Sequence, residues 1–583
     1  MSVQRLCNDI SKKCVVSSKM EPAMDFVERY ENPVSWHKKY DLRDDLLRKD
    51  VLFDNMDMKS ITMAQYDPHN LPEYIKWRLF GYNIVICYEY ISKGNNDDAL
   101  KIINDIENIL SSIGNNDPFL KSIKVALNHI TFSMKGHLWH LCSMDIKKLE
   151  HFVMPINMNN ANKAGLYGVQ TLFFYEYDLP YAHIAKNSAL KAIELNNSEP
   201  EWHFLLARVL TYWQRTCGNY FECSEQEINA SERAVKLGDK PQHKLHLIHI
   251  YHRMSKNMKK NINAKNEILD AGLQLLNEVM NSTNDLLLLK NCLLSLSKIS
   301  LDKDFYSNNI SEILETLISK LESTNNGYVH GAIGNYYLFN KKDIEKANFH
   351  LKKAYDVKSF GCSIDYIYTL YLMNPNTAPV EQMMVDMLKT FTHPVHREKI
   401  LSQVVSYLIV TKNNLIQALK YIPILLSFKN VTCVYSLQTH RLKFYPKHKS
   451  MNLIDLLSER LDAALKDSKL PADHKKRVVE VLQIFEPYKM FVSNLMQDKS
   501  HLFGNNFKKD SSSKSNRQFN QNSREKESWK QKSHTQNNTY VKINEKQNWR
   551  TLKPDSNPNP HVFSNQQKDI KNNGVKIKSR FDF

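Results

Sequence analysis

The sequence predicts an all-α protein in which tetratricopeptide-type helical hairpins stack into a superhelical solenoid. The 583-residue chain contains only 15 Gly, and no proline interrupts residues 242–374, as expected for long helical regions. A helix-turn-helix pattern with small residues at its packing positions recurs along the chain. One such hairpin cannot bury its apolar face alone, so each hairpin implies neighbours that stack on it.

The clearest repeat spans residues 331–356. Its second helix carries Ala347, Leu351 and Ala354 at i, i+4 and i+7, which places them on one apolar face. The polar turn at residues 340–343 has one residue more than the repeat pattern needs. Because small residues let two helix backbones approach closely, this stretch predicts a packed helix pair.

Two further repeats follow the same pattern at residues 80–108 and 165–195. In the second of these, Ala185, Ala189 and Ala192 form the close-packed face. A hairpin that turns near residues 135–136 is predicted at 121–152, and residues 217–226 are interpreted as an insertion. Further helices are predicted at 202–215, 228–237, 243–255, 264–280, 284–299, 309–322, 363–373, 379–391, 396–410, 414–428, 451–466 and 473–496.

Composition predicts three regions: an irregular segment at residues 1–40, the solenoid at 41–500, and a disordered basic tail at 501–583. The last 79 residues hold 17 Lys+Arg and 7 Asp+Glu, so they carry +10 of the net charge of +17. Asn, Gln and Ser make up 31 of these 79 residues. A segment with so few apolar residues cannot offset the entropic cost of ordering.

Several classes of protein are disfavoured by the sequence. No stretch approaches 18 uncharged apolar residues, and the N-terminus lacks the apolar core of a secretory signal. Nine cysteines without framework spacing favour reduced thiols, so we expect a cytoplasmic protein with no membrane contact. Phosphate-binding glycine loops, nucleophile elbows and zinc-protease motifs are absent from the sequence. We therefore expect no enzymatic activity and no cofactor, while the oligomeric state stays open.

The basic tail interleaves cations with single aromatic residues. Trp529 and Lys530 form one such group, and Trp549 and Arg550 form another. Positive charge attracts the phosphate backbone of nucleic acids, and aromatic rings stack on unpaired bases. The alternative is a tail that keeps the protein soluble or carries short motifs for protein partners.

Two stretches of the predicted solenoid are candidates for a ligand-binding groove. In the helix at 202–215, Arg208, Tyr212 and Arg215 share one face, where two guanidiniums beside a phenol suit phosphates and a stacked base. The alternative is an ordinary solvated or salt-bridged face. The histidine-rich run at 242–253 offers a second basic surface with no obvious closing metal ligand, formed by Lys244, His246, His249 and Arg253.

Two strings resemble a known family. The first is YNIVICYEYISKGNNDDALKIINDIE at 82–107, and the second is EPEWHFLLARVLTYWQR at 199–215. They resemble repeats of the interferon-induced proteins with tetratricopeptide repeats, and the resemblance covers roughly residues 45–430. It implies a right-handed superhelix with a basic central tunnel for the 5′ end of RNA, and an antiviral role.

The triphosphate pocket of that family is not reproduced by this sequence. With Pro200 aligned on the inter-repeat proline of the family, the pocket arginine falls at Tyr212. A lysine and a tyrosine of the pocket fall at Glu176 and Ala182. Three nearby residues could replace these pocket residues only after a shift of one helical turn: Tyr181, Arg208 and Arg215.

We therefore expect a non-enzymatic protein that binds single-stranded RNA, or an RNA 5′ end, through a basic groove and a basic tail. The alternative is a tetratricopeptide scaffold that holds protein segments in its groove and uses the tail as a docking region. A groove that clamps acidic C-termini needs Lys, Arg and Asn on successive first helices, and only Asn83 fits this pattern cleanly.

Overall fold

The computed structural model describes residues 31–40, 58–59, 61–62, 65–67, 70–142, 158–177, 181–216, 221–258, 261–301, 310–392, 394–429, 431–445 and 450–503. These residues are almost wholly helical, so the all-α prediction is confirmed. The predicted tail lies outside the described residues beyond Phe503, and the predicted irregular segment lies outside them before residue 31. Irregular structure up to residue 40 is wrong, because Pro33–Tyr40 form the helix α3, and the tail boundary at 501 is wrong by a few residues, because the helix α26 (Ala472–Phe503) continues to Phe503. The chain divides by its internal contacts into Met1–Leu495 and Met496–Phe583, and every helix up to α25 belongs to the first unit.

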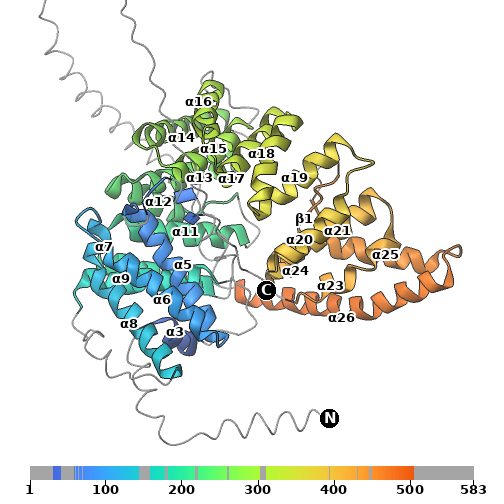
Figure 1. Ribbon diagram of the computed structural model, residues 1–583, viewed down its shortest axis with the longest axis horizontal. Coiled ribbons are helices and arrows are strands. Elements are labelled where there is room, and N and C mark those ends of the chain that lie inside the picture. Colours follow the sequence, from blue (N-terminus) through green and yellow to red (C-terminus); the bar gives the residue numbers. More distant parts are fainter. Residues whose placement is uncertain are drawn as a thin grey trace, which may run out of the picture. The chain divides into compact units, whose positions relative to one another are not determined.

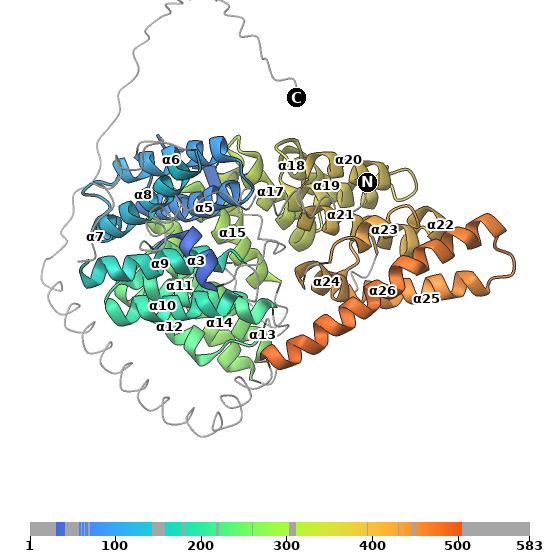
Figure 2. The same cartoon turned by 90° about the horizontal axis from the view of Figure 1, so that it is seen from below.

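Among the described residues, seven helix pairs form the hairpins of the solenoid, and residues 118–141 lie between the first pair and the second in the chain (Figure 1). The first helices are α5 (Glu73–Ser92), α9 (Asn160–Tyr175), α11 (Pro200–Thr216), α13 (Pro241–Asn257), α15 (Leu286–Ser300), α17 (Gly327–Tyr336) and α19 (Phe360–Met373). Their partners are α6 (Asn96–Ser111), α10 (Ala182–Leu195), α12 (Glu225–Gly238), α14 (Ile262–Ser282), α16 (Ile310–Glu322), α18 (Ile344–Asp356) and α20 (Val380–Thr390). First helices contact one another in the pairs α5–α9, α9–α11, α13–α15, α15–α17 and α17–α19, and α9 to α12 lie side by side in Figure 2. This stacking is that of a tetratricopeptide-type solenoid, as predicted.

The remaining helices are α3 (Pro33–Tyr40), α7 (Pro118–Ser122), α8 (Lys124–Leu141), α21 (Pro394–Ser406), α22 (Leu415–Ala418), α23 (Ile422–Leu426), α24 (Val431–Gln438), α25 (Leu453–Lys466) and α26 (Ala472–Phe503). The turn predicted near residues 135–136 is wrong, because α8 continues through them with Met134 and Leu138 fully buried. The helix predicted at 414–428 is broken, since Pro423 lacks an amide hydrogen and lies in the first turn of the separate helix α23. Helix α24 and the antiparallel strands β1 (His440–Arg441) and β2 (Ser450–Met451) were not predicted.

The extra residue in the repeat at 331–356 is accommodated by a π-helical turn. This turn, η4 (Tyr337–Lys341), follows α17 directly, and Lys342 after it has a φ of 58° in the left-handed region. Asp343 then caps α18 by accepting a hydrogen bond of 3.0 Å from the Lys346 amide. A π turn contains one more residue than an α turn, so the packing register of α18 is kept. A second π turn, η5 (Tyr407–Thr411), follows α21.

The predicted small-residue faces are buried between the helices. Ala347, Leu351 and Ala354 on α18 are 0% exposed, and so are Ala185, Ala189 and Ala192 on α10. Close-packed interfaces tolerate little added volume, so these side chains determine how near the two helices of each hairpin can lie. The register predicted for both repeats is confirmed.

A polar contact joins the start of α5 and the residues before it to the start of α15. The Tyr66 and Tyr74 hydroxyls both donate to Asp285 Oδ2, at 2.9 and 2.7 Å, across more than 200 residues of sequence. Burial and then the charge of Asp285 raise the pKa of both tyrosines. The other oxygen, Asp285 Oδ1, caps α15 by accepting from the amides of Leu287 and Leu288. The first hairpin is therefore anchored to the start of the fifth.

Candidate functional site

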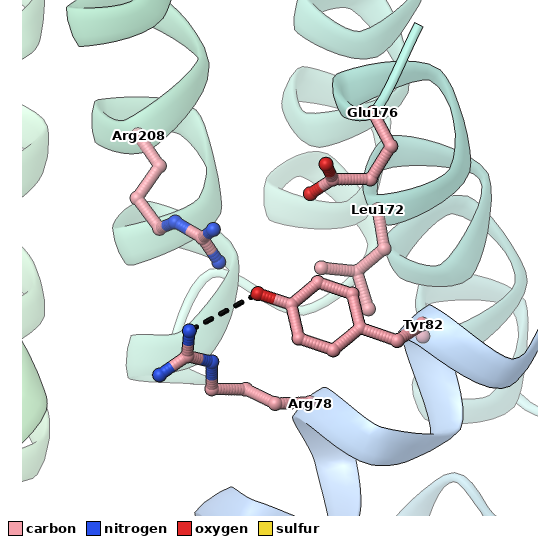
Figure 3. A pocket seen from close by; sticks show the side chains of 6 residues that line it. Arg78, Tyr82, Leu172, Glu176 and Arg208 are labelled. Carbon is pink, nitrogen blue, oxygen red and sulfur yellow. Dashed lines mark hydrogen bonds between the residues drawn. The ribbon is translucent and has the colours of Figure 1, made fainter. Parts of the chain in front are cut away.

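A small pocket lies on the first helices of the N-terminal hairpins (Figure 3). Its walls come from α5, α9 and α11, which stack in succession. Two guanidiniums, a phenol and a carboxylate meet there. The lining residues are Arg78, Gly81, Tyr82, Leu172, Glu176 and Arg208.

Gly81 lets α5 approach α9 at this point. A Cβ atom at Gly81 would lie 2.8 Å from Leu172 Cδ1, closer than carbon atoms normally come. Arg78 and Tyr82 are four residues apart on α5, so they share one face, and Arg78 Nη2 donates to the Tyr82 hydroxyl at 3.1 Å. The close approach of the two helices therefore places this pair opposite α9.

Arg208 on α11 stacks on aromatic rings. Its Cζ lies 4.6 Å from the centre of the Tyr175 ring and 5.6 Å from that of Phe204. The Tyr212 ring packs edge-on against Tyr175 at 5.6 Å between ring centres. The cation–π contacts hold the half-buried guanidinium in place. Arg208 and Tyr212 therefore belong to one cluster, whereas the Arg215 side chain lies outside the described residues.

Glu176 points into the pocket with only 5% of its surface exposed. No other described residue lies within hydrogen-bond or ion-pair distance of its carboxylate. Burial alone would lower the pKa of Arg208. The electrostatic effects of Tyr175 and Glu176 raise it, and the pKa is raised overall. Glu176 thus acts as a counter-charge to Arg208 without a direct ion pair.

The side chains leave room for little more than one water molecule. The free volume is about 10 Å³, close to the lower limit for a single water. A terminal triphosphate does not fit into this volume, and the charge of Glu176 opposes a group with several negative charges. The absence of the family's triphosphate pocket, expected from the alignment that puts Glu176 at the position of a lysine, agrees with this geometry.

Two of the predicted histidines on α13 continue this surface. The His246 ring lies 5.5 Å from the Phe204 ring between ring centres. Burial, and then the charge of Arg208, lowers the pKa of His246 to about 3. Burial, and then His246 and Lys298, lowers that of His249 to about 2. Both imidazoles are therefore neutral at pH 7 and can donate and accept hydrogen bonds.

The other two residues predicted on α13 form ion pairs with acidic side chains of the protein. Arg253 is 0% exposed, forms an ion pair with Glu227 and donates to the Glu222 carbonyl at 2.9 Å. Lys244 lies between Asp239 at 2.6 Å and Glu278 at 2.7 Å. The expectation that Arg253 and Lys244 line a basic groove is wrong, because a buried cation needs partner carboxylates and the neighbouring helices supply them.

Some predicted site residues are not placed by the structure, and others were missed. Trp529, Lys530, Trp549 and Arg550 lie outside the described residues, so the tail stays a prediction. Arg78 and Tyr82 were not expected, although their i, i+4 spacing on α5 is the sequence signal that indicates them. Within the described ranges, no three His, Cys, Asp or Glu side chains are arranged to hold a metal ion. No described helix is long and apolar enough to cross a membrane.

The fold and this site define a tetratricopeptide-type solenoid whose N-terminal first helices carry cations and aromatic rings. No protein-family model matches the sequence, and no curated protein matches it either. Among solved structures, the human IFIT1 dimer with PPP-AAAA has a TM-score of 0.42 at 14% identity, over 82% of this chain and 99% of that chain. The human IFIT1 dimer with m7Gppp-AAAA has a TM-score of 0.42 at 13% identity, over 81% and 99%. The expected resemblance is present, but at this identity and TM-score it does not indicate what this chain binds.

Proposed function

We propose that this chain binds single-stranded RNA, without catalysis, across the first helices of its N-terminal hairpins. The observation that carries the proposal is the Arg208 guanidinium, which is half-buried and stacked between Tyr175 and Phe204. The rings cover the faces of this guanidinium, and its N–H groups can still donate from the edge to a phosphate. The surrounding aromatic rings offer further faces for unpaired bases.

The binding surface extends along α13. His246 packs against Phe204, and the His249 ring lies 6.4 Å from the His246 ring between ring centres. Neutral imidazoles can hydrogen-bond to base edges and to the 2′-hydroxyl group, which distinguishes RNA from DNA. The basic tail at 505–583 adds phosphate contacts that do not depend on sequence.

The charge of Glu176 determines which part of the RNA lies here. A terminal triphosphate is disfavoured by the carboxylate and by the lack of free volume. The strand therefore passes over Arg208 with its bases and internal phosphates. An antiviral role is implied only by the family resemblance, and a cytoplasmic location and the absence of enzymatic activity are expected only from the sequence. All three stay predictions.

The experiment measures the affinity of the full chain for one single strand with 5′-hydroxyl, triphosphate or capped ends, at two salt concentrations. We expect Arg208→Gln with Arg78→Gln to weaken binding about tenfold or more and to reduce the salt slope. Arg233→Gln with Lys236→Gln, which removes the same charge from two exposed positions on α12, is the matched control. If the double variant binds like the control, this site does not bind RNA. If no form of the chain binds RNA at moderate salt, the scaffold alternative is favoured.

A further inference from the structure

A second, much larger cavity lies in the C-terminal half of the solenoid. It is half-open to solvent and is lined by α15, α17, η4 and α19, with Arg441 of β1 also in the lining. Its volume of about 670 Å³ lies within the range of small-molecule sites, about 300–1,000 Å³. All of its walls belong to the unit Met1–Leu495.

The charges around this cavity have one sign. Lys298, Lys342 and Arg441 line it with exposed side chains, and no Asp or Glu is among the described residues that line it. Neither Lys342 nor Arg441 has a carboxylate of another described residue within ion-pair distance. The rim is therefore suited to an anion.

The interior of the cavity is apolar and aromatic. Tyr336, Phe339 and Tyr368 contribute rings, and Leu294 and Leu372 contribute aliphatic surface. A flat apolar body can be buried here while its charged group stays at the rim. This combination matches a nucleotide, whose base is planar and whose phosphate is anionic.

Two buried polar atoms near the aromatic rings lack hydrogen-bond partners among the described residues. They are Asn335 Oδ1 and Ser297 Oγ, and both residues line the cavity. Buried polar groups are usually satisfied, so unpaired ones at a cavity wall point to a ligand that supplies the missing bonds. Both oxygens can accept from an exocyclic amino group of a base, and asparagine amides are frequent partners of adenine.

The inserted residue of the central repeat helps to build this site. The π turn η4 contributes Phe339 and Asn340 to the cavity, and Lys342 follows it in the left-handed conformation. Single π turns occur frequently at functional sites. Gln403 Nε2 donates to the Arg441 carbonyl at 2.8 Å and fixes the backbone of β1.

We propose that this cavity binds a nucleoside 5′-monophosphate whose base carries an exocyclic amino group. The base lies among Tyr336, Phe339 and Tyr368, with its amino group at Asn335, and the phosphate lies between Lys342 and Arg441. The ligand is either a free nucleotide or one unit of an RNA strand. The proposal does not depend on RNA binding at Arg208, because the two sites share no lining residue.

Calorimetric titration of the full chain tests the site with AMP, with IMP and with inorganic phosphate. IMP is the matched ligand, since it replaces the amino group of adenine by an oxygen. We expect AMP to bind about tenfold or more tightly than either competitor. Arg441→Gln and Lys342→Gln should each weaken AMP binding about tenfold, whereas Arg233→Gln should leave it unchanged. Asn335→Leu should remove the preference for AMP over IMP.

The outcomes separate the parts of the proposal. Equal affinities for AMP and phosphate would overturn base recognition, and equal affinities for AMP and IMP would overturn recognition of the amino group. AMP binding that is unaffected by Arg441→Gln and Lys342→Gln would overturn the site itself. A short 5′-hydroxyl oligoadenylate identifies the source: if it binds through Arg441 and AMP does not, the ligand is a strand. Absence of both interactions would overturn the proposal, while loss of RNA binding in Arg208→Gln alone would not affect it.

Discussion

The two hollows of this solenoid differ in the balance of their charges more than in the number of their cations. The N-terminal pocket combines Arg78 and Arg208 with the buried carboxylate of Glu176, and its free volume is about 10 Å³. The C-terminal cavity has three cations and no described acidic side chain in its lining, and its volume is about 670 Å³. A cation with a nearby counter-charge is already stabilised, whereas one without it gains more from an anionic ligand. The first region therefore suits contact along a strand, and the second suits enclosure of a small anion.

The largest expected effect is a loss of stability that is confined to the N-terminal hairpins. A Cβ atom at Gly168 would lie 2.3 Å from the Trp202 ring, so Gly168→Ala forces α9 and α11 apart. We expect the free energy of unfolding to fall by about 1–3 kcal/mol, and RNA affinity to fall with it. The control is Gly272→Ala on α14, where a Cβ atom meets nothing within 4 Å. Thermal unfolding of both variants measures the difference, and AMP binding should survive Gly168→Ala because solenoid repeats depend mainly on their neighbours.

Removing residues 505–583 should separate general attraction from site binding. The truncated protein loses a charge of +10, so we expect roughly tenfold weaker binding to all single strands and a flatter salt dependence. Binding of AMP in the cavity should stay unchanged. Fluorescence anisotropy at two salt concentrations measures both. A loss confined to one RNA sequence would contradict a non-specific role of the tail.

The comparison also predicts that the first pocket can be made more like the second. Glu176→Gln removes the carboxylate but keeps its shape, so affinity for a 5′-triphosphate RNA should rise by roughly three- to tenfold. Glu176→Asp keeps the charge and is the control, for which we expect no such gain. Affinities of triphosphate and 5′-hydroxyl strands, measured side by side, give the result. An unchanged ratio would show that the carboxylate does not govern the choice of RNA end.

A last expected effect, which does not involve a ligand, is a dependence of stability on pH. Burial and neighbouring cations lower the pKa of His246 to about 3 and that of His249 to about 2, whereas an unfolded histidine titrates near 6.5. Below pH 6.5 the unfolded chain therefore takes up protons that the folded chain does not, and stability falls as the pH decreases. Denaturant titrations at pH 7 and pH 5 measure the free energy of unfolding. Its decrease between the two pH values should be smaller for His246→Gln than for the unchanged protein. The same decrease in both proteins would contradict the role of this histidine.

The hairpins could be predicted because their signal is local. Ala347, Leu351 and Ala354 lie on one helical turn or the next, and their spacing alone indicates a packed face. The spacing of residues 340–343 also revealed an insertion. It could not reveal that a π turn absorbs this insertion and lines a cavity, since the other walls come from residues up to about 100 positions away.

The site was harder to predict because the sequence does not show which residues the side chain of each cation contacts in the fold. Arg208 and Arg253 both follow helical spacing, yet Arg208 stacks in the pocket while Arg253 is buried against Glu227. The deciding residue lies on another helix in each case. A single sequence does not show which cation meets a carboxylate inside the fold.

The anchoring of Tyr66 and Tyr74 to Asp285 affects how the protein can be made. Repeats that contact only their neighbours can fold one after another as they are synthesised. Here the segment before α5 finds its partner more than 200 residues later. At about 5–20 residues per second, synthesis of that interval takes roughly 10–40 s. During that interval the first hairpin lacks its hydrogen bonds to Asp285. Chaperones can bind it in the nascent chain until Asp285 is synthesised.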